Sequence, residues 1–169
     1  MKKKLSAFTL ALLLALPFLA GAVYTNSLIN LVLRYNALCG DQLSLIESVA
    51  EPKVGKEFDA YTISLNKYAA LAVQTSSGTN NILEAMVFAS GDGSAMAGAR
   101  IMQTLGAFCG ALGFIDKLDQ SYEFLEKAGL FKDGALDGRL NKYQVDHHTI
   151  TFAQIKGVGL MFTVVLPEK

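Results

Sequence analysis

The sequence predicts an α+β domain in which an antiparallel meander sheet of five to six strands packs against two or three helices. Three observations predict this class. Apolar residues recur at helical spacing over 26–49, strand-like runs follow with short turns between them, and a second apolar helix separates two groups of such runs. Short connections favour antiparallel neighbours, and strands grouped between helices are typical of α+β folds.

The first helix is expected over 26–49, with Thr25 or Asn26 as its cap. Its apolar positions stand three or four residues apart: Leu28, Leu31, Val32, Tyr35, Leu38, Leu45 and Val49. Pro52 and Gly55 then favour the end of the helix, because proline and glycine are poor helix formers.

Three strands are expected next, at 57–65, 68–75 and 82–89, where β-branched and aromatic residues are frequent. Residues 66–67 and 76–81 are rich in turn-forming side chains and connect the three runs. These strands are therefore predicted to form an antiparallel meander.

The second helix is expected over 95–115 and is apolar on nearly every side, which indicates a central, buried helix. A third helix is expected over 116–128, ending at Gly129, a residue suited to a helix C-terminus. Strands at 139–146, 149–155 and 158–166 complete the sheet, with a hairpin turn at 156–157.

A short internal echo links the two parts of the chain. Residues 37–40 read Ala-Leu-Cys-Gly and residues 107–110 read Ala-Phe-Cys-Gly, each within an expected helix. Four residues do not establish a duplication. They leave open an architecture in which a unit of one helix and one meander is used twice.

Residues 1–22 have the order of a secretory signal peptide. Lys2, Lys3 and Lys4 precede an apolar run over 7–16, Pro17 interrupts that run, and residues 20–22 are small. The alternative is an uncleaved anchor, which needs about 20 apolar residues, more than this run provides. We therefore expect cleavage after Ala22, no stable membrane anchor afterwards, a single domain over 23–169, and a periplasmic or secreted protein.

Charge argues against one class of partner. The chain has 15 basic and 15 acidic residues, and cleavage would remove three lysines, which leaves a formal charge of −3. No basic stripe of the kind that nucleic acid requires is visible. We expect no nucleic-acid partner.

Cys39 and Cys109 are the two cysteines, and an even pair in an exported domain predicts a disulfide. Each is followed by glycine, at Gly40 and Gly110, which removes a side chain where two helices could cross closely. A disulfide needs Cα atoms roughly 4.4 to 6.8 Å apart. The sequence therefore predicts that a Cys39–Cys109 disulfide cross-links the first and second helices; the alternative is two buried thiols.

Asp146, His147 and His148 form the one place where strong bases or metal ligands stand together. On a strand, alternate side chains share a face, so Asp146 and His148 could act together whereas His147 could not join them. A metal site would need ligands from elsewhere, and no zinc-type spacing is present. We therefore expect no metal and no cofactor, and at most a polar site formed by these three residues.

Three functions remain open after these observations. The leading hypothesis is an exported, non-catalytic protein that binds an envelope or secreted protein partner, because no catalytic arrangement is visible. The first alternative is a carrier of an apolar small molecule or lipid, with Met96, Ile101 and Leu105 of the second helix lining its cavity. The second alternative is an enzyme of unrecognised type that uses Asp146 and His148.

Overall fold

The computed structural model describes residues 24–39 and 43–167, so the predicted signal peptide lies outside the described residues. One antiparallel sheet packs against helices, which confirms the α+β class. The strands are β1 (Lys53–Val54), β2 (Phe58–Asn66), β3 (Ala69–Ser76), β4 (Ile82–Ala89), β5 (Asn141–Val145), β6 (His148–Ile155) and β7 (Gly159–Val165). The sheet has seven strands, whereas the sequence predicts five to six. The missing strand is β1, because its two residues are too few to show an alternating pattern.

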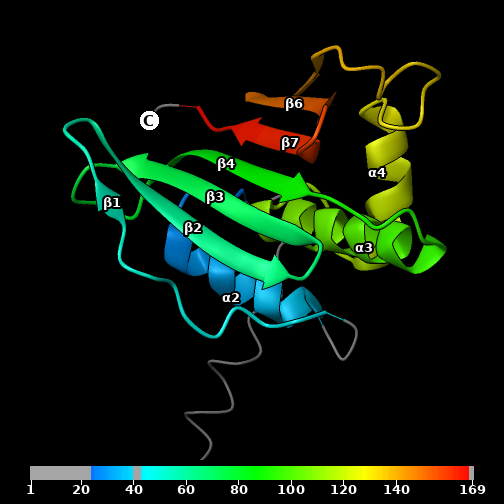
Figure 1. Ribbon diagram of the computed structural model, residues 1–169. Helices are drawn as coiled ribbons and strands as arrows, with labels where there is room; N and C mark the ends of the chain where they lie inside the picture. Colours follow the sequence, from blue (N-terminus) through cyan, green and yellow to red (C-terminus); the bar gives the residue numbers. More distant parts are fainter. Residues whose placement is uncertain (1–23, 40–42, 168–169) are drawn as a thin grey trace, which may run out of the picture.

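The sheet order shows how the chain is organised. The helices are α2 (Leu28–Cys39), α3 (Ala95–Leu112) and α4 (Ser121–Lys127), with a short 3₁₀ turn at Leu118–Gln120. The strands lie in the order β1-β2-β3-β4-β7-β6-β5. A helix followed by a three-stranded meander thus occurs twice, as α2 with β2–β4 and as α3 with β5–β7, and the last strands of the two meanders pair at the centre (Figure 1).

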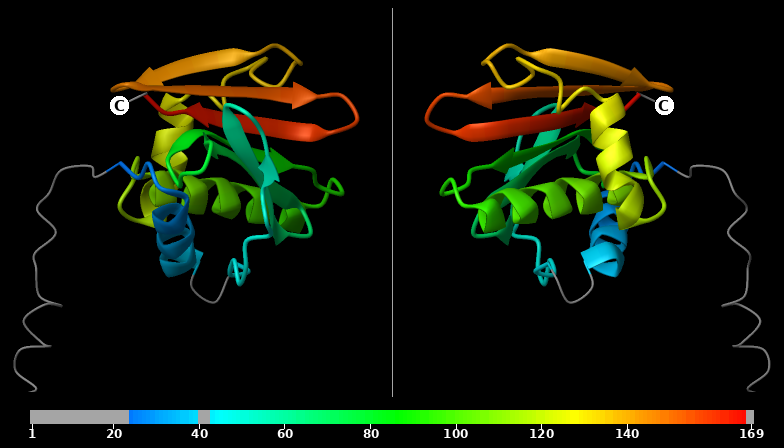
Figure 2. Two further views of the ribbon diagram at one scale, coloured as in Figure 1. Left: turned by 90° about the vertical axis from the view of Figure 1, so that its left-hand side faces the viewer. Right: turned by 90° about the vertical axis from the view of Figure 1, so that its right-hand side faces the viewer.

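Helices α2 and α3 lie together on one face of the sheet (Figure 2). The alternation of β3 explains this arrangement, since its residues are buried at every second position. The largest fully buried side chains come from the two helices and from the sheet and include Tyr35, Phe108, Phe152 and Phe162. No helix within 24–39 or 43–167 is long and apolar enough to cross a bilayer.

Local capping explains the limits of α3. The Ser94 side chain accepts a hydrogen bond from the Ala97 backbone N–H at 3.1 Å, which satisfies one free donor of the first turn. At the other end Gly113 has φ 97°, and its N–H donates to the carbonyls of Cys109 and Gly110. Glycine takes this left-handed conformation without steric cost, so the helix ends there.

The first helix is shorter than the sequence predicts. It ends at Cys39 instead of continuing to Val49, and residues 43–50 have no regular structure. The Asn36 side chain explains the local path: its amide donates to the Ile46 carbonyl at 2.9 Å and its oxygen accepts from the Ile46 N–H at 2.8 Å. Leu43 and Ile46 of this loop are buried, whereas Leu45, one of the positions that continue the helical spacing, is 54% exposed.

The predicted disulfide is wrong: Cys39 and Cys109 are buried free thiols that are not close to each other. The reason lies at the helix crossing. A Cβ atom at Gly110 would lie 2.6 Å from Leu38 Cδ1, so Leu38 occupies the space that this glycine leaves. Cys39, one residue further around the helix, points its sulfur toward the Ser44 carbonyl at 3.7 Å. The glycine permits a close crossing without bringing the sulfurs together.

Candidate functional site

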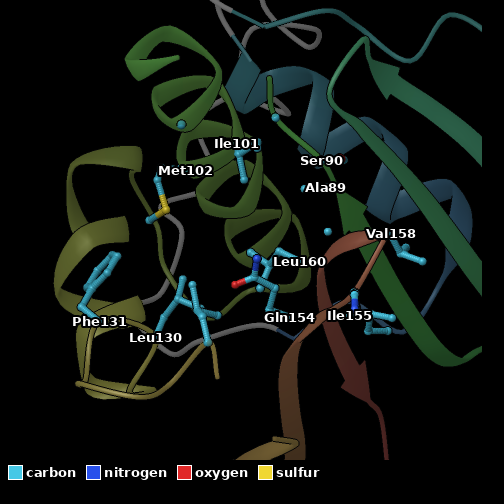
Figure 3. Close-up of a pocket in the computed structure, with 16 residues that line it drawn as sticks. Ala89, Ser90, Ile101, Met102, Leu130, Phe131, Gln154, Ile155, Val158 and Leu160 are labelled. Atoms are coloured by element: carbon cyan, nitrogen blue, oxygen red, sulfur yellow. The ribbon is translucent and has the colours of Figure 1, made fainter. Parts of the chain in front are cut away.

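One hollow in the described structure lies between α3 and the β6–β7 hairpin (Figure 3). This open pocket, here called the Lys156 groove, has a volume of about 670 Å³. Its lining residues are Ala89, Ser90, Gly91, Gly98, Ile101, Met102, Leu130, Phe131, Leu136, Gln154, Ile155, Lys156, Gly157, Val158, Gly159 and Leu160. Small-molecule sites fall in about this size range and are mostly apolar, so the groove has the dimensions of a ligand site.

The helical wall of the groove contains a gap. Gly98, Ile101 and Met102 are three and four residues apart, so they share one face of α3. Gly98 is exposed, and a Cβ atom built there would meet nothing within 4 Å. A glycine inside a helix costs about 1 kcal/mol relative to alanine. Close packing does not require this glycine, and a larger side chain at this lining position has open space around its Cβ atom.

The wall opposite the hairpin is built by the segment after α4. Phe131 stacks on Tyr122 of α4 with ring centroids 4.8 Å apart, and Leu130 N–H donates to the Leu125 carbonyl at 3.0 Å. These contacts tie the segment that carries two apolar lining side chains to α4. The groove therefore depends on α4, which stands at one end of the sheet (Figure 1).

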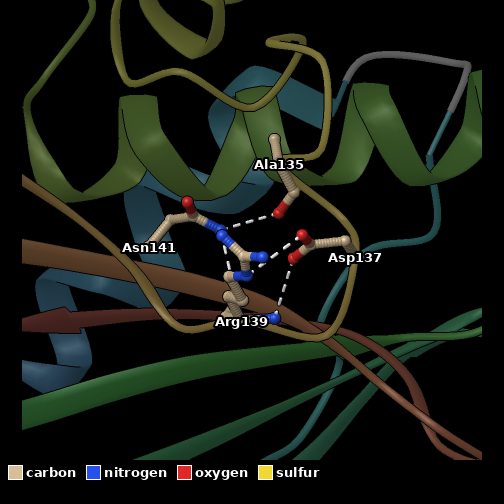
Figure 4. A network of polar contacts seen from close by, with 4 residues as sticks. All are labelled: Ala135, Asp137, Arg139 and Asn141. Atoms are coloured by element: carbon tan, nitrogen blue, oxygen red, sulfur yellow. Dashed lines mark hydrogen bonds and ion pairs between the residues drawn. The ribbon is translucent and has the colours of Figure 1, made fainter.

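A polar network holds the loop that carries Leu136 (Figure 4). The Asn141 amide donates to the carbonyls of Ala135 at 2.7 Å and Arg139 at 3.2 Å. Arg139 pairs with Asp137 at 3.2 Å, but its side chain is 85% exposed, so this pair contributes little. Asn141 is the residue that ties the loop to the start of β5.

Few polar groups enter the Lys156 groove. Gln154 carries the amide seen in the middle of the close-up, beside Leu160 (Figure 3). Ser90 lies at the end of β4, and Lys156 lies in the β6–β7 turn. Lys156 is the one charged residue of the lining. An apolar ligand with a single polar end matches this distribution.

A second hollow lies beside α2 in the first half of the chain. This Glu51 groove has a volume of about 370 Å³ and is lined by Leu28, Ile29, Val32, Leu33, Val49, Ala50, Glu51, Pro52, Tyr61 and Asn80. Like the Lys156 groove, it includes the beginning of a helix and the turn before the last strand of a meander. The remaining wall differs, because it follows α2 directly in the Glu51 groove and follows α4 in the Lys156 groove.

The three residues that sequence analysis assigned to a cavity lie in different places. Ile101 is in the wall of the Lys156 groove. Met96 is 69% exposed in the first turn of α3 and is not part of the lining, and Leu105 is fully buried in the core. The structure therefore brings one of the three to the groove.

Asp146, His147 and His148 lie at the β5–β6 hairpin. Asp146 and His147 form its two-residue turn, where Asp146 has φ 50°, and His148 begins β6 and is 5% exposed. The Tyr24 hydroxyl donates to an Asp146 carboxylate oxygen. The Tyr24 ring also lies over His148, with centroids 4.3 Å apart. Tyr24 thus packs on this hairpin, a contact between residues far apart in the sequence that no local pattern predicts.

The surroundings of His148 favour a neutral imidazole. Burial lowers the pKa of His148, which the Asp146 charge partly opposes. Among the described residues its buried Nδ1 has no hydrogen-bond partner, and the Phe114 ring packs edge-on with ring centroids 5.2 Å apart. Burial, together with the bond to Asp146, raises the pKa of Tyr24 to about 12. This packing supports a structural role for Asp146 and His148, and their use by an enzyme stays a prediction.

Two further findings bear on function. Within 24–39 and 43–167 there is no group of three or more His, Cys, Asp or Glu side chains placed to hold a metal ion. Comparisons with protein-family models, curated proteins and solved structures find no match. The two grooves and the residues that line them are therefore the features that indicate a function.

Proposed function

We propose that this protein is an exported, non-catalytic binding protein that holds an apolar small molecule or acyl chain in the Lys156 groove. The observation that carries the proposal is an apolar hollow of about 670 Å³ with few polar groups. The open space at Gly98 supports it, because this residue lies in the helical wall and a Cβ atom built there meets no atom within 4 Å. The predicted signal peptide supports a periplasmic or secreted location.

A pair of substitutions at Gly98 tests ligand binding. Gly98→Phe should fill the groove and abolish binding of the neutral fluorescent probe N-phenyl-1-naphthylamine. Gly98→Ala should keep binding and raise stability by about 1 kcal/mol, because alanine is the better helix former and its Cβ meets no atom. Probe titration with parallel thermal unfolding measures both effects. Equal probe binding by the two variants would overturn the proposal.

The export part of the proposal has its own test. Mass spectrometry of the periplasmic or secreted fraction should find a chain that begins at or close to Val23. A variant with Ala20 and Ala22 replaced by leucine should accumulate uncleaved, because the peptidase requires small residues. Recovery of the intact chain in the membrane fraction of the unchanged protein would contradict export.

Binding of an envelope or secreted protein partner is the second candidate. The observation that favours it is the exposure of Ile29 and Leu33, at 56% and 62%, on the side of α2 that borders the Glu51 groove. Replacing both with serine should leave stability within about 0.5 kcal/mol, since neither is buried. If a partner binds here, the same change should shift the native protein from a complex to its monomer size in gel filtration of the exported fraction.

A further inference from the structure

The two grooves carry opposite charge. Lys156 is the one charged lining residue of the larger groove, whereas Glu51 is the one charged lining residue of the smaller groove. Both linings are otherwise mainly apolar. Size and apolar character allow a ligand in either place, so the charge at each rim distinguishes the ligands that the two grooves can accept.

The charge of Lys156 is available to a ligand. Lys156 forms no ion pair in the described part of the chain. Asp92 and Asp137, which flank the lining segments in sequence, are engaged elsewhere: Asp92 accepts from the Ser94 N–H at 2.9 Å, and Asp137 pairs with Arg139. A cation at the rim of an apolar groove favours a ligand whose polar end is negative.

We propose that the ligand of the Lys156 groove is a single-chain amphiphile with an anionic head group, a carboxylate or a phosphate. The proposal rests on the proposed function and specifies its ligand class. The apolar chain packs along Ile101, Met102 and Leu160, and the head group pairs with Lys156 at the β6–β7 turn. Gln154 and Ser90, which also line the groove, form hydrogen bonds with the polar end of the ligand.

The test compares ligands of equal chain length in displacing N-phenyl-1-naphthylamine, each below its aggregation concentration. Dodecanoate should bind about fivefold more tightly than 1-dodecanol or dodecyltrimethylammonium, the gain typical of one exposed ion pair. Dodecyl phosphate distinguishes the two head groups, since preference for either anion supports the proposal. The advantage of the anion should shrink at high salt because salt screens exposed charges.

Charge reversal supplies the matched control. Lys156→Glu should weaken dodecanoate binding about tenfold and reverse the preference in favour of the cationic ligand, whereas Glu51→Lys should leave the ranking unchanged. Both residues are exposed, so neither change should unfold the protein. Equal affinity for all head groups, or a ranking that Lys156→Glu does not alter, would overturn the anionic assignment.

The two proposals fail in distinguishable ways. If the neutral probe binds the unchanged protein and is lost in Gly98→Phe while head-group charge has no effect, the groove binds apolar ligands and only the anionic assignment is wrong. If Gly98→Phe and Gly98→Ala bind the probe equally, the proposed function itself is wrong.

Discussion

The two halves of the molecule share one plan and differ in how the end of the sheet is closed. In the first half the chain before α2 is bonded to the β3–β4 turn: Leu28 N–H donates to the Asn80 carbonyl at 2.9 Å, and Ile82 N–H donates to the Asn26 carbonyl at 2.8 Å. In the second half, within the described residues, no backbone hydrogen bond joins 90–94 to the β6–β7 turn. The larger groove lies at that turn.

The difference shows how one topology yields either core or ligand surface. Thr75 and Gln154 stand at the same place, six residues after the start of β3 and of β6. Thr75 is fully buried, whereas Gln154 is exposed and lines the Lys156 groove. The first half, with backbone pairing before α2, has the smaller hollow of about 370 Å³, and the second half, where the described residues show no such pairing, has the hollow of about 670 Å³.

The largest expected effect concerns Gly159, the first residue of β7, in the second half of the molecule. Gly159 has φ 117°, and a Cβ atom there would collide with the Ala89 carbonyl. Gly159→Ala should lower the free energy of unfolding by about 3 kcal/mol through strain and overpacking. Gly157→Ala, also at positive φ but with nothing within 4 Å, should cost about 1 kcal/mol. Denaturant unfolding measures the loss of stability in both variants. Equal losses would show that the close approach of Gly159 to the Ala89 carbonyl does not exclude a side chain at position 159.

A substitution at Asn141 should loosen the loop that carries Leu136, one of the residues that line the Lys156 groove. Asn141→Ala removes two hydrogen bonds to loop carbonyls and should destabilise the protein by about 1–2 kcal/mol. Because the loop carries Leu136, probe binding should weaken as well. Arg139→Ala should change stability by less than about 0.5 kcal/mol, since its ion pair is exposed. If Arg139→Ala weakened binding as much as Asn141→Ala, the loop would be held in another way.

The two halves should contribute differently to the pH dependence of stability. The second half has a titratable residue, His148, at the start of β6, where the first half has Ala69 at the start of β3. Burial lowers the pKa of folded His148 below its ordinary value of 6.5. The unfolded chain therefore binds the proton more tightly, so this contribution to stability is complete above pH 6.5 and is lost as the pH falls through the folded pKa. Thermal unfolding between pH 8 and 4 should show the loss.

The neighbouring histidine is the control for that titration. His148→Phe should reduce the decline in stability below pH 6.5, because it keeps a ring in the aromatic cluster and removes the titrating group. His147→Gln, in the exposed turn, should leave most of the decline in place, because burial is the largest cause of the lowered His148 pKa and the His147 charge is a smaller one. A decline that persists undiminished in His148→Phe would assign it to other groups.

The smallest expected effect is the response to reducing agent, which should be none. Cys39 and Cys109 are free in the structure, one in each half, so reduction should not shift the midpoint of thermal unfolding. Burial raises the pKa of both thiols, and native labelling should therefore be slow. Labelling in denaturant should find two thiols per chain. One or none would contradict the geometry of the helix crossing.

Local patterns predicted most of the elements. Strand β4 lies at 82–89 as expected, and α3 begins at Ala95 because Ser94 caps it and ends close to its expected limit. The first helix predicted from the sequence is too long, because Leu45 and Val49 continue the helical spacing. In the structure the Asn36 side chain holds this part of the chain in a loop. Side-chain bonds of this kind depend on residues ten positions apart and leave no periodic signal.

The candidate site was less predictable than the fold. Ile101 could be proposed because it lies on an apolar helix, but Leu130, Gln154 and Leu160 join it only through the packing of separate elements. The disulfide was predicted from composition and from two glycines, and failed because Leu38, next to Cys39, fills the space at Gly110. The direction in which a side chain leaves its helix decides such contacts, and spacing along the chain does not report it.

Position 98 is a place where selection for durability alone and selection for binding should leave different sets of residues. A laboratory evolution experiment that rewards heat resistance alone should replace this glycine early, since alanine gains helix stability without a clash. Larger replacements would be equally acceptable to that selection and would obstruct the groove. A population evolved with ligand binding as a second requirement should keep glycine or alanine at position 98, so the residues tolerated there would record which property was under selection.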